Sequence, residues 1–219
     1  GGIFGGSLYF FTENTALGIT QASNVSFIIC TAPLLTTILS LLFYKSEKAS
    51  KGLIYGSLLA LMGVGLIVFN GSFVLKISPI GDLLTLLAAL SWAFYSLIIK
   101  KMAGRYPTVF ITRKIFFYGV LTILPAFLLH PLQPDTAVLL QPGVLFNLLF
   151  LAVLASLICY VLWNVVLKQL GTVRASNYIY LNPLVTMIAS SLILDEKITL
   201  VALGGAACIV CGVYWAEKK

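Results

Sequence analysis

The sequence has little charge and few of the side chains that enzymes use for chemistry. Charged residues make up 10% of the 219-residue chain, which contains seven acids, one His and four Cys. Soluble domains usually carry about 25% charged residues, and a catalytic or metal centre needs several acids, His or thiolates close together. Most of the acids are predicted to lie in loops, and His130 has no candidate partner. We therefore expect neither an enzyme nor a metal ion or other cofactor.

Long apolar runs dominate the chain instead. Hydrophobic residues account for 60% of it, and the mean hydropathy is +1.03. A helix needs about 20 apolar residues to cross the hydrocarbon layer of a bilayer. The sequence therefore predicts an all-α polytopic membrane protein with eight transmembrane helices, which we place at 1–18, 22–44, 53–70, 80–99, 115–129, 144–167, 178–194 and 198–215.

The basic residues are distributed unevenly between the two sides of this predicted bundle. Fourteen Lys and Arg against seven acids give a net charge of +7. Twelve of them fall on one side, in the loops after the second, fourth and sixth spans and in the C-terminal tail, whereas Lys76 and Lys197 fall on the other. Because cytoplasmic loops carry the excess of Lys and Arg, we expect a multi-pass protein of the cell (inner or plasma) membrane with both ends cytoplasmic. Topology thus accounts for the positive charge without a nucleic-acid partner.

One stretch of the sequence occurs twice. The first copy contains Ala22-Ser23-Asn24, Pro33-Leu34 and Glu47-Lys48, and the second contains Ala175-Ser176-Asn177, Pro183-Leu184 and Glu196-Lys197; each is followed by a Gly-rich apolar span. Asn14 and Asn164 are 150 positions apart, as are Pro33 and Pro183. The copies start five predicted spans apart, an odd number, so equivalent segments cross the membrane in opposite directions. An inverted repeat of this kind is typical of transporters built from two related halves.

A repeat unit of five spans implies ten helices in two inverted five-helix repeats, of which eight are expected here. We assign residues 1–70 to the last three helices of the first repeat and residues 71–219 to a complete second repeat. The first two helices of the first repeat are then expected to be missing from the sequence.

The doubled motif resembles the EamA-type permeases of the drug/metabolite transporter superfamily. The first copy reads Ala16-Leu17-Gly18-Ile19-Thr20-Gln21-Ala22-Ser23-Asn24 before Pro33 and Glu47, and the second reads Gly171-Thr172-Val173-Arg174-Ala175-Ser176-Asn177 before Pro183 and Glu196. The resemblance covers essentially the whole chain. It implies ten helices in two inverted halves, cytoplasmic ends, and transport of metabolites, amino acids or drug-like compounds, often outward.

From the repeat and the resemblance we expect a membrane transporter that moves small organic metabolites or drug-like solutes by alternating access, with export as the expected direction. The alternative is a membrane scaffold or signalling protein that keeps a permease fold without transport. The expected partners are a small-molecule substrate and the lipid bilayer. Glycines at GxxxG spacing, such as Gly52 and Gly56, let helices approach closely, either within one subunit or across a homodimer.

Glu13 is a candidate for a role in transport because ionisable side chains inside a bilayer are costly, at roughly 2.5–3.5 kcal/mol on insertion scales. It lies near the outer end of the first predicted span, beside Asn14. One interpretation is a carboxylate that couples transport to protons or binds a cation. The other is a solvated, structural carboxylate at the outer interface.

Polar and aromatic residues within the spans are the remaining candidates for a substrate pathway. Asn needs a partner or water in lipid, whereas Tyr and Trp could line a site for an amphipathic solute, pack in the core or form an interfacial belt. The candidates are Asn14, Asn24, Thr31, Trp92, Tyr95, Ser96, Tyr160, Trp163, Asn164, Asn177, Tyr180 and Asn182. Pro33 and Pro183 are predicted to kink their helices, which would either expose backbone carbonyls to a cavity or only shape the packing.

Overall fold

The computed structural model describes residues 1–44, 50–69, 78–129, 136–193 and 198–218. Within these ranges the chain is helical and forms no strand, so the predicted all-α class is confirmed. The elements are η1 (Ile3–Ser7), α1 (Leu8–Ile19), α2 (Ala22–Ile29), α3 (Ala32–Phe43), α4 (Lys51–Phe69), α5 (Pro79–Ala103), α6 (Thr108–Leu129), α7 (Thr136–Leu139), α8 (Pro142–Leu149), η2 (Phe150–Ile158), α9 (Cys159–Leu170), α10 (Thr172–Asn177), η3 (Tyr178–Leu181), α11 (Asn182–Ile193) and α12 (Leu200–Glu217). Of the residues discussed above, Glu47-Lys48, Lys76, His130 and Glu196-Lys197 lie outside the described ranges.

Local signals in the sequence begin and end these helices. Pro79 occupies the first turn of α5, where its missing N–H is not needed, and the Asp82 carboxylate accepts a hydrogen bond from the Ser78 N–H at 3.2 Å. The Thr199 hydroxyl caps α12 by accepting from the Ala202 N–H at 3.2 Å. Gly171, with φ of 80°, ends α9 in a conformation that side-chain-bearing residues rarely adopt.

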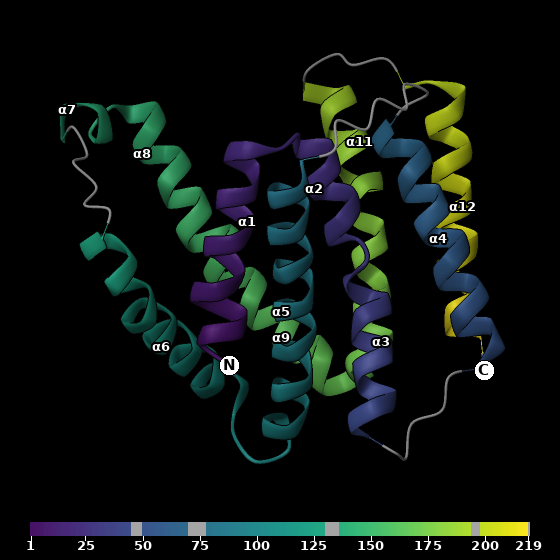
Figure 1. Cartoon of the computed structure of the whole chain (residues 1–219), viewed down its shortest axis with the longest axis horizontal. Helices are drawn as coiled ribbons and strands as arrows, with labels where there is room; N and C mark the ends of the chain where they lie inside the picture. Colours follow the sequence, from purple (N-terminus) through teal and green to yellow (C-terminus); the bar gives the residue numbers. More distant parts are fainter. Residues whose placement is uncertain (45–49, 70–77, 130–135, 194–197, 219) are drawn as a thin grey trace.

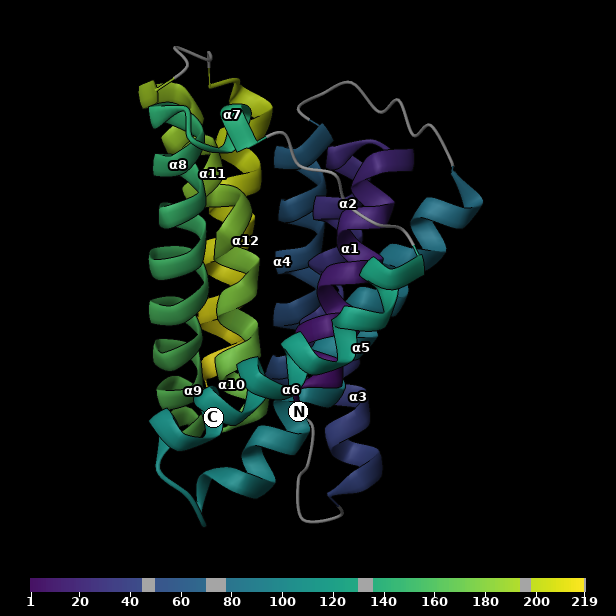
Figure 2. The same ribbon diagram turned by 90° about the vertical axis from the view of Figure 1, so that its left-hand side faces the viewer.

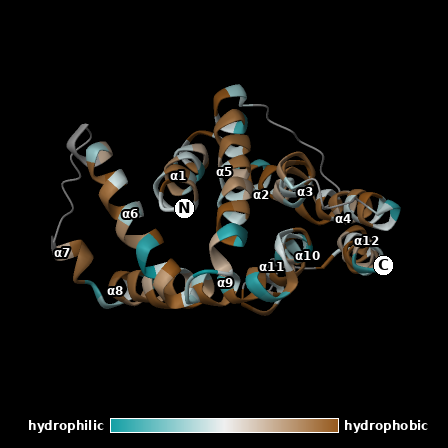
Figure 3. Cartoon of the chain, turned by 90° about the horizontal axis from the view of Figure 1, so that it is seen from below, coloured by the Kyte–Doolittle hydropathy of each residue, from teal (hydrophilic) through white to brown (hydrophobic). Residues whose placement is uncertain are grey.

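The long helices run roughly side by side in two layers (Figures 1 and 2). One layer contains α1, α2, α3, α4 and α5, and the other contains α8, α9, α10, α11 and α12. Both chain termini lie in the lower half of the view in Figure 1. Figure 3 shows hydrophobic residues predominating along α3, α4 and α8.

In the described part of the chain, six helical segments are long and apolar enough to cross a membrane. They are 22–43, 51–69, 79–103, 108–126, 142–170 and 200–217. The first joins α2 with α3, and the fifth joins α8, η2 and α9. The remaining two predicted spans correspond to η1 with α1 and to η3 with α11, which are also helical. The structure thus supports a polytopic membrane protein.

The structure refines the helix boundaries and the proline positions expected from the sequence. Helix α6 begins at Thr108, so Arg113 and Lys114, which we expected in a loop, lie on a helix. Long basic side chains can occupy the last turns of a membrane helix because their charged ends reach toward the interface. Pro33 and Pro183 are each the second residue of a new helical element, α3 and α11, so the regular α-helix is interrupted just before each proline that is predicted to kink it.

Helices α4 and α12 make the most extensive contact of any pair of elements in the described chain. A Cβ added to Gly63 would lie 2.5 Å from the Gly205 carbonyl oxygen, and one added to Gly205 would lie 2.7 Å from the Gly63 carbonyl oxygen. Gly56 and Gly212 contact each other in the same way, at a second point along the same helix pair. Side chains at these positions would separate the two backbones.

The opposite side of the molecule is loosely covered. Helix α8 and η2 contain no buried residue, and large apolar side chains such as Phe146 and Leu151 are more than half exposed. An extended apolar surface of this kind is expected where a protein meets lipid or another apolar element.

Candidate functional site

A cavity of about 250 Å³ lies between the two layers, where α1, α2, α3, α5, α9, η3 and α11 meet. Its walls are mostly apolar and aromatic. The lining residues are Tyr9, Ile29, Ala32, Ala89, Trp92, Trp163, Tyr178, Ile179 and Asn182. A concave, largely apolar pocket with a few polar groups is the usual form of a small-molecule site.

Both repeat copies contribute a helix break to this cavity. In the first copy α2 ends at Ile29 and α3 starts at Ala32, and both of these residues line the cavity. In the second copy the 3₁₀ turn η3 joins α10 to α11, and its residues Tyr178 and Ile179 line the cavity together with Asn182. Non-helical backbone at membrane depth is tolerated where it is buried in protein or lines a cavity.

Trp92 is the centre of an aromatic cluster on the α1, α5 and α9 side of the cavity. Its ring centroid lies 5.1 Å from that of Tyr9, 5.2 Å from that of Tyr95 and 5.8 Å from that of Trp163. Tyr160 completes the cluster with an edge-to-face contact to Trp92 at 5.7 Å. Contacts in this range are favourable beyond the area that they bury, so the cluster gives the cavity a stiff aromatic wall.

The indole nitrogens of Trp92 and Trp163 are both buried, and neither has a hydrogen-bond partner among the described residues. An indole N–H can only donate, and buried donors in proteins are normally paired. Both side chains line the cavity. A molecule in the cavity that presents hydrogen-bond acceptors would satisfy these two donors.

Behind the aromatic wall, a chain of buried hydrogen bonds joins three helices. The Tyr95 hydroxyl of α5 donates to Asn164 Oδ1 of α9 at 2.7 Å. Asn164 Nδ2 donates to the Thr112 hydroxyl of α6 at 2.9 Å, and this hydroxyl donates to the Thr108 carbonyl at 3.0 Å. Every group in the chain is paired, so these residues hold the wall in place.

The π-helical turn η1 is fitted against the same wall. A Cβ at Gly5 would collide with the Tyr95 ring. The carbonyl oxygens of Phe4 and Gly5 accept hydrogen bonds from the Ser91 hydroxyl at 2.8 Å and the Tyr160 hydroxyl at 2.6 Å. Irregular turns leave carbonyls that other groups must satisfy, and here α5 and α9 supply the donors.

Glu13 is half-buried on α1 and accepts a hydrogen bond from the Tyr9 hydroxyl at 3.0 Å. Because Tyr9 lines the cavity, the carboxylate is connected to the cavity through one side chain. Asn14, beside it, is exposed, and its amide donates to the Phe10 carbonyl of its own helix at 2.8 Å.

The remaining sequence candidates are not among the residues that line the cavity. The hydroxyls of Thr31 and Ser96 donate to the carbonyls of Ile28 and Trp92 on neighbouring turns. Asn24 and Asn177, equivalent in the two copies, are both buried, and neither amide atom of Asn177 has a partner among the described residues. Tyr180 packs in a separate apolar cluster around Val64 and Ile209. Of the predicted site residues, therefore, Trp92, Trp163 and Asn182 line the cavity, and Tyr95, Tyr160, Asn164 and Glu13 adjoin those that do.

Several residues of the site were not among those predicted from the sequence. Tyr9 precedes Glu13 by four positions, a spacing that brings side chains together on a helix, and this signal could have identified it. Tyr178 and Ile179 directly follow the repeated Asn177. Ala32 and Ala89 leave room for the cavity because they are small, and Thr112 carries no signal in the sequence.

Comparison with known proteins identifies relatives over nearly the whole chain. A sequence model described as the EamA-like transporter family matches residues 1–69 and 79–216, which confirms the predicted resemblance. An uncharacterized transporter of Archaeoglobus fulgidus is 29% identical over 217 residues, which cover 98% of this chain and 73% of that protein. A probable amino-acid metabolite efflux pump of Salmonella typhimurium is 29% identical over 182 residues, covering 78% of this chain and 60% of that protein.

The fold is also found among solved structures. One crystal structure superposes with a TM-score of 0.81 at 20% sequence identity, covering 99% of this chain and 73% of the other. At this identity the likeness concerns the fold alone.

Proposed function

Because the chain belongs to the EamA-like transporter family, we propose that it moves small organic solutes across the membrane through the cavity lined by Trp92, Trp163 and Asn182. The observation that carries this proposal is that one cavity combines two helix breaks, one from each repeat copy, with two indole donors that lack a partner among the residues the structure describes. Paired breaks in the two halves of a transporter commonly mark its substrate site.

In this proposal the chain has eight spans, and residues 1–70 and 71–219 belong to two inverted repeats. Two pairs of equivalent features support the assignment. The π-helical η1 precedes α1 as the π-helical η2 precedes α9, and the breaks before Pro33 and Pro183 correspond. Rocking of the two units against each other would open the cavity to each side in turn.

An exported, amphipathic metabolite or drug-like compound is the substrate that we propose. The cavity offers aromatic faces and donor groups, and none of its lining residues carries a charge. The name of the Salmonella relative, a probable amino-acid metabolite efflux pump, supports outward transport.

The aromatic wall and the Asn164 hydrogen bonds would hold the site in shape, while Glu13 could couple transport to protons through Tyr9.

For the orientation we propose a cytoplasmic C-terminus. The ends of α5 and α9 and the start of α4 lie in the lower half of Figure 1, as the C-terminus does, and carry Lys51, Lys100, Lys101 and Lys168. This is the distribution expected of a cytoplasmic side. An accessibility tag added after Lys219 should react only with reagents applied from the cytoplasm, and labelling from outside would overturn the orientation.

The transport proposal can be tested by profiling metabolites outside cells that express the full-length protein or its Trp163→Ala/Asn164→Ala variant, at matched amounts in the membrane. We expect a solute that accumulates outside only with the intact protein. If neither export nor uptake into reconstituted vesicles differs between the two proteins for any solute, the transport proposal fails and a scaffold role is favoured.

A further inference from the structure

A second groove, remote from the central cavity, lies at the basic end of the α4–α12 pair. Its volume is about 520 Å³, and it is lined by Ser50, Lys51, Gly52, Tyr55, Trp215 and Lys218. Transport through the central cavity assigns no role to this groove. It combines two lysines with two aromatic side chains, and both aromatics are largely exposed, Tyr55 at 65% and Trp215 at 52%.

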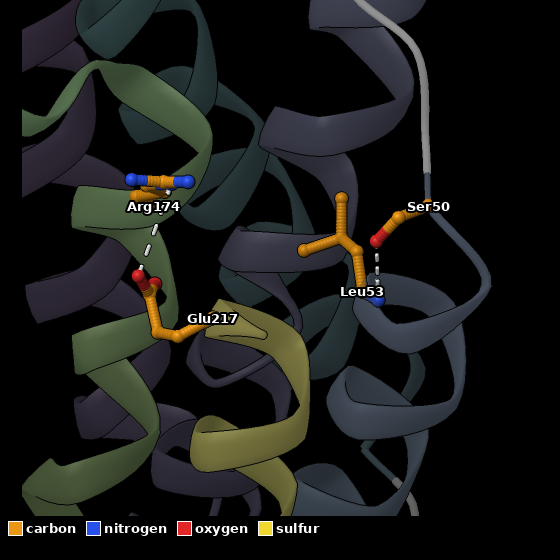
Figure 4. A network of polar contacts seen from close by, with 4 residues as sticks. All are labelled: Ser50, Leu53, Arg174 and Glu217. Carbon is orange, nitrogen blue, oxygen red and sulfur yellow. Dashed lines mark hydrogen bonds and ion pairs between the residues drawn. The ribbon is translucent and has the colours of Figure 1, made fainter. Parts of the chain in front are cut away.

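At the groove, the backbone of α4 packs directly against the backbone at the end of α12. A Cβ at Gly52 would lie 2.8 Å from the Trp215 carbonyl oxygen and 3.5 Å from that of Lys218. The start of α4 therefore rests directly on the last turn of α12, which places Lys51 and Lys218 at the same groove. The Ser50 hydroxyl accepts from the Leu53 N–H at 3.0 Å and caps the first turn of α4 (Figure 4).

The positive charge of the groove is not cancelled by the acid beside it. Glu217 precedes Lys218, but its carboxylate is directed toward Arg174 of α10, with Oε2 3.9 Å from the Arg174 Nε (Figure 4). Lys51 and Lys218 are exposed, and neither forms an ion pair within the described residues.

Repeat symmetry does not explain these residues. Gly205 follows Gly56 by 149 positions, as Gly212 follows Gly63, and the four glycines pack symmetrically at the crossing. At the same interval, the counterparts of Lys51, Tyr55, Trp215 and Lys218 are Leu200, Gly204, Leu66 and Phe69. The apolar crossing is thus present in both copies, whereas none of the four groove positions has a Lys, Tyr or Trp as its counterpart. Because the two lysines with Tyr55 and Trp215 lie at one end of the α4–α12 pair, we expect them to bind a partner found at one face of the membrane.

We propose that this groove binds the headgroup of an anionic phospholipid. Tyr and Trp settle at the level of the headgroups because their rings are amphipathic, and lysines at that level attract anionic lipid. The apolar flanks of α4 and α12 would accommodate the acyl chains. The proposal is independent of which solute the central cavity carries, so its failure and the failure of the transport proposal are distinguishable.

The experiment uses Trp215 as its own reporter. The chain has three tryptophans, so Trp92→Phe/Trp163→Phe leaves Trp215 alone. This variant is placed in phosphatidylcholine nanodiscs that contain a small fraction of either brominated phosphatidylglycerol or brominated phosphatidylcholine. The quenching of Trp215 fluorescence is then compared between the two brominated lipids. We expect stronger quenching by the anionic lipid, and an affinity for it that falls about fivefold for each lysine removed in Lys51→Gln and Lys218→Gln.

The control removes the same charge elsewhere at the same end. Lys101→Gln/Lys168→Gln should leave the lipid preference unchanged, because neither side chain lines the groove. Equal quenching by both lipids, or a preference that survives Lys51→Gln/Lys218→Gln, overturns the proposal. Displacement by millimolar inorganic phosphate would also overturn it, since it would identify a site for free phosphate.

A second measurement guards against misfolding of the single-tryptophan protein. Native mass spectrometry of the protein with all three tryptophans should retain phosphatidylglycerol, with several-fold less retained by Lys51→Gln/Lys218→Gln. Equal retention by the two proteins would contradict the proposal.

Discussion

Helices α4 and α12 cross with glycine against glycine, whereas the helices around the central cavity meet through large aromatic side chains. At the crossing, backbone atoms of Gly63 and Gly205 leave no space for a Cβ. Around Trp92, ring centroids stand 5.1 to 5.8 Å apart and an open volume of about 250 Å³ remains beside them.

The two regions also differ in their polar groups: the crossing is apolar, whereas the cavity wall contains hydrogen-bonding side chains. The crossing buries small residues and apolar side chains such as Val64 and Ile209. The cavity wall contains two donors that have no partner within the described part of the chain, and hydrogen bonds from Tyr95 to Thr112 lie behind them. We infer that the crossing contributes mainly to stability and the cavity mainly to recognition, so variants in the two regions should have separable effects.

The largest effect is expected from a side chain placed in the crossing. Gly205→Val puts a Cβ 2.7 Å from the Gly63 carbonyl oxygen and 2.9 Å from Leu66 Cβ, and overpacking typically costs about 1–3 kcal/mol, with the upper end expected where the clash is with backbone. Thermal unfolding in detergent should show a large loss of stability. Gly204→Val is the matched control, because a Cβ there meets nothing within 4 Å; similar losses for the two variants would mean that helix propensity, not the crossing, sets the stability.

A smaller loss is expected from the hydrogen-bond chain behind the cavity. Asn164→Ala removes the acceptor of Tyr95 and leaves a buried hydroxyl unpaired, at a cost of about 1–2 kcal/mol. A double-mutant cycle with Tyr95→Phe, followed by thermal unfolding, should give a coupling energy of about 1 kcal/mol. Additive effects of the two substitutions would show that the pair does not act as a unit.

Removing an indole donor from the cavity should weaken substrate recognition with little change in stability. Trp92→Phe and Trp163→Phe each delete one N–H, and the loss of one hydrogen bond to a ligand weakens binding by roughly three- to tenfold. The KM for the exported solute is the quantity to measure. Trp215→Phe is the control, since Trp215 lies outside the cavity; an equal rise in KM there would argue against the assigned site.

The smallest effect is expected at the surface. Arg174 and Glu217 approach to 3.9 Å, with side chains 44% and 26% exposed, and exposed ion pairs contribute about 0–1 kcal/mol. Arg174→Gln should therefore lower the unfolding temperature only slightly, and the difference should shrink as salt is raised. A loss comparable to that of Asn164→Ala would show that the contact anchors the end of α12.

Part of the site could be predicted from residue type and position. Trp92, Trp163 and Asn182 were expected in the pathway because large aromatics and amides within apolar spans need a partner or a cavity, and all three line the cavity. The prediction failed to separate these from Thr31 and Ser96, whose hydroxyls bond to their own helices. Hydroxyl groups often pair with a carbonyl one turn away, and the sequence does not reveal which of them do so.

The sequence by itself determined that this is a helical membrane protein with a repeated motif, because hydropathy and repeats are properties of contiguous residues. It also marked the paired prolines at which the helices restart. Only the tertiary structure decided which residues share the cavity. The bond between Tyr95 and Asn164 joins positions 69 apart, and the Gly5 carbonyl meets a hydroxyl 155 positions away. Such contacts depend on the rotation of each helix about its axis and on the angles at which neighbouring helices cross. Many contacts between residues far apart in the sequence determine these rotations and angles jointly.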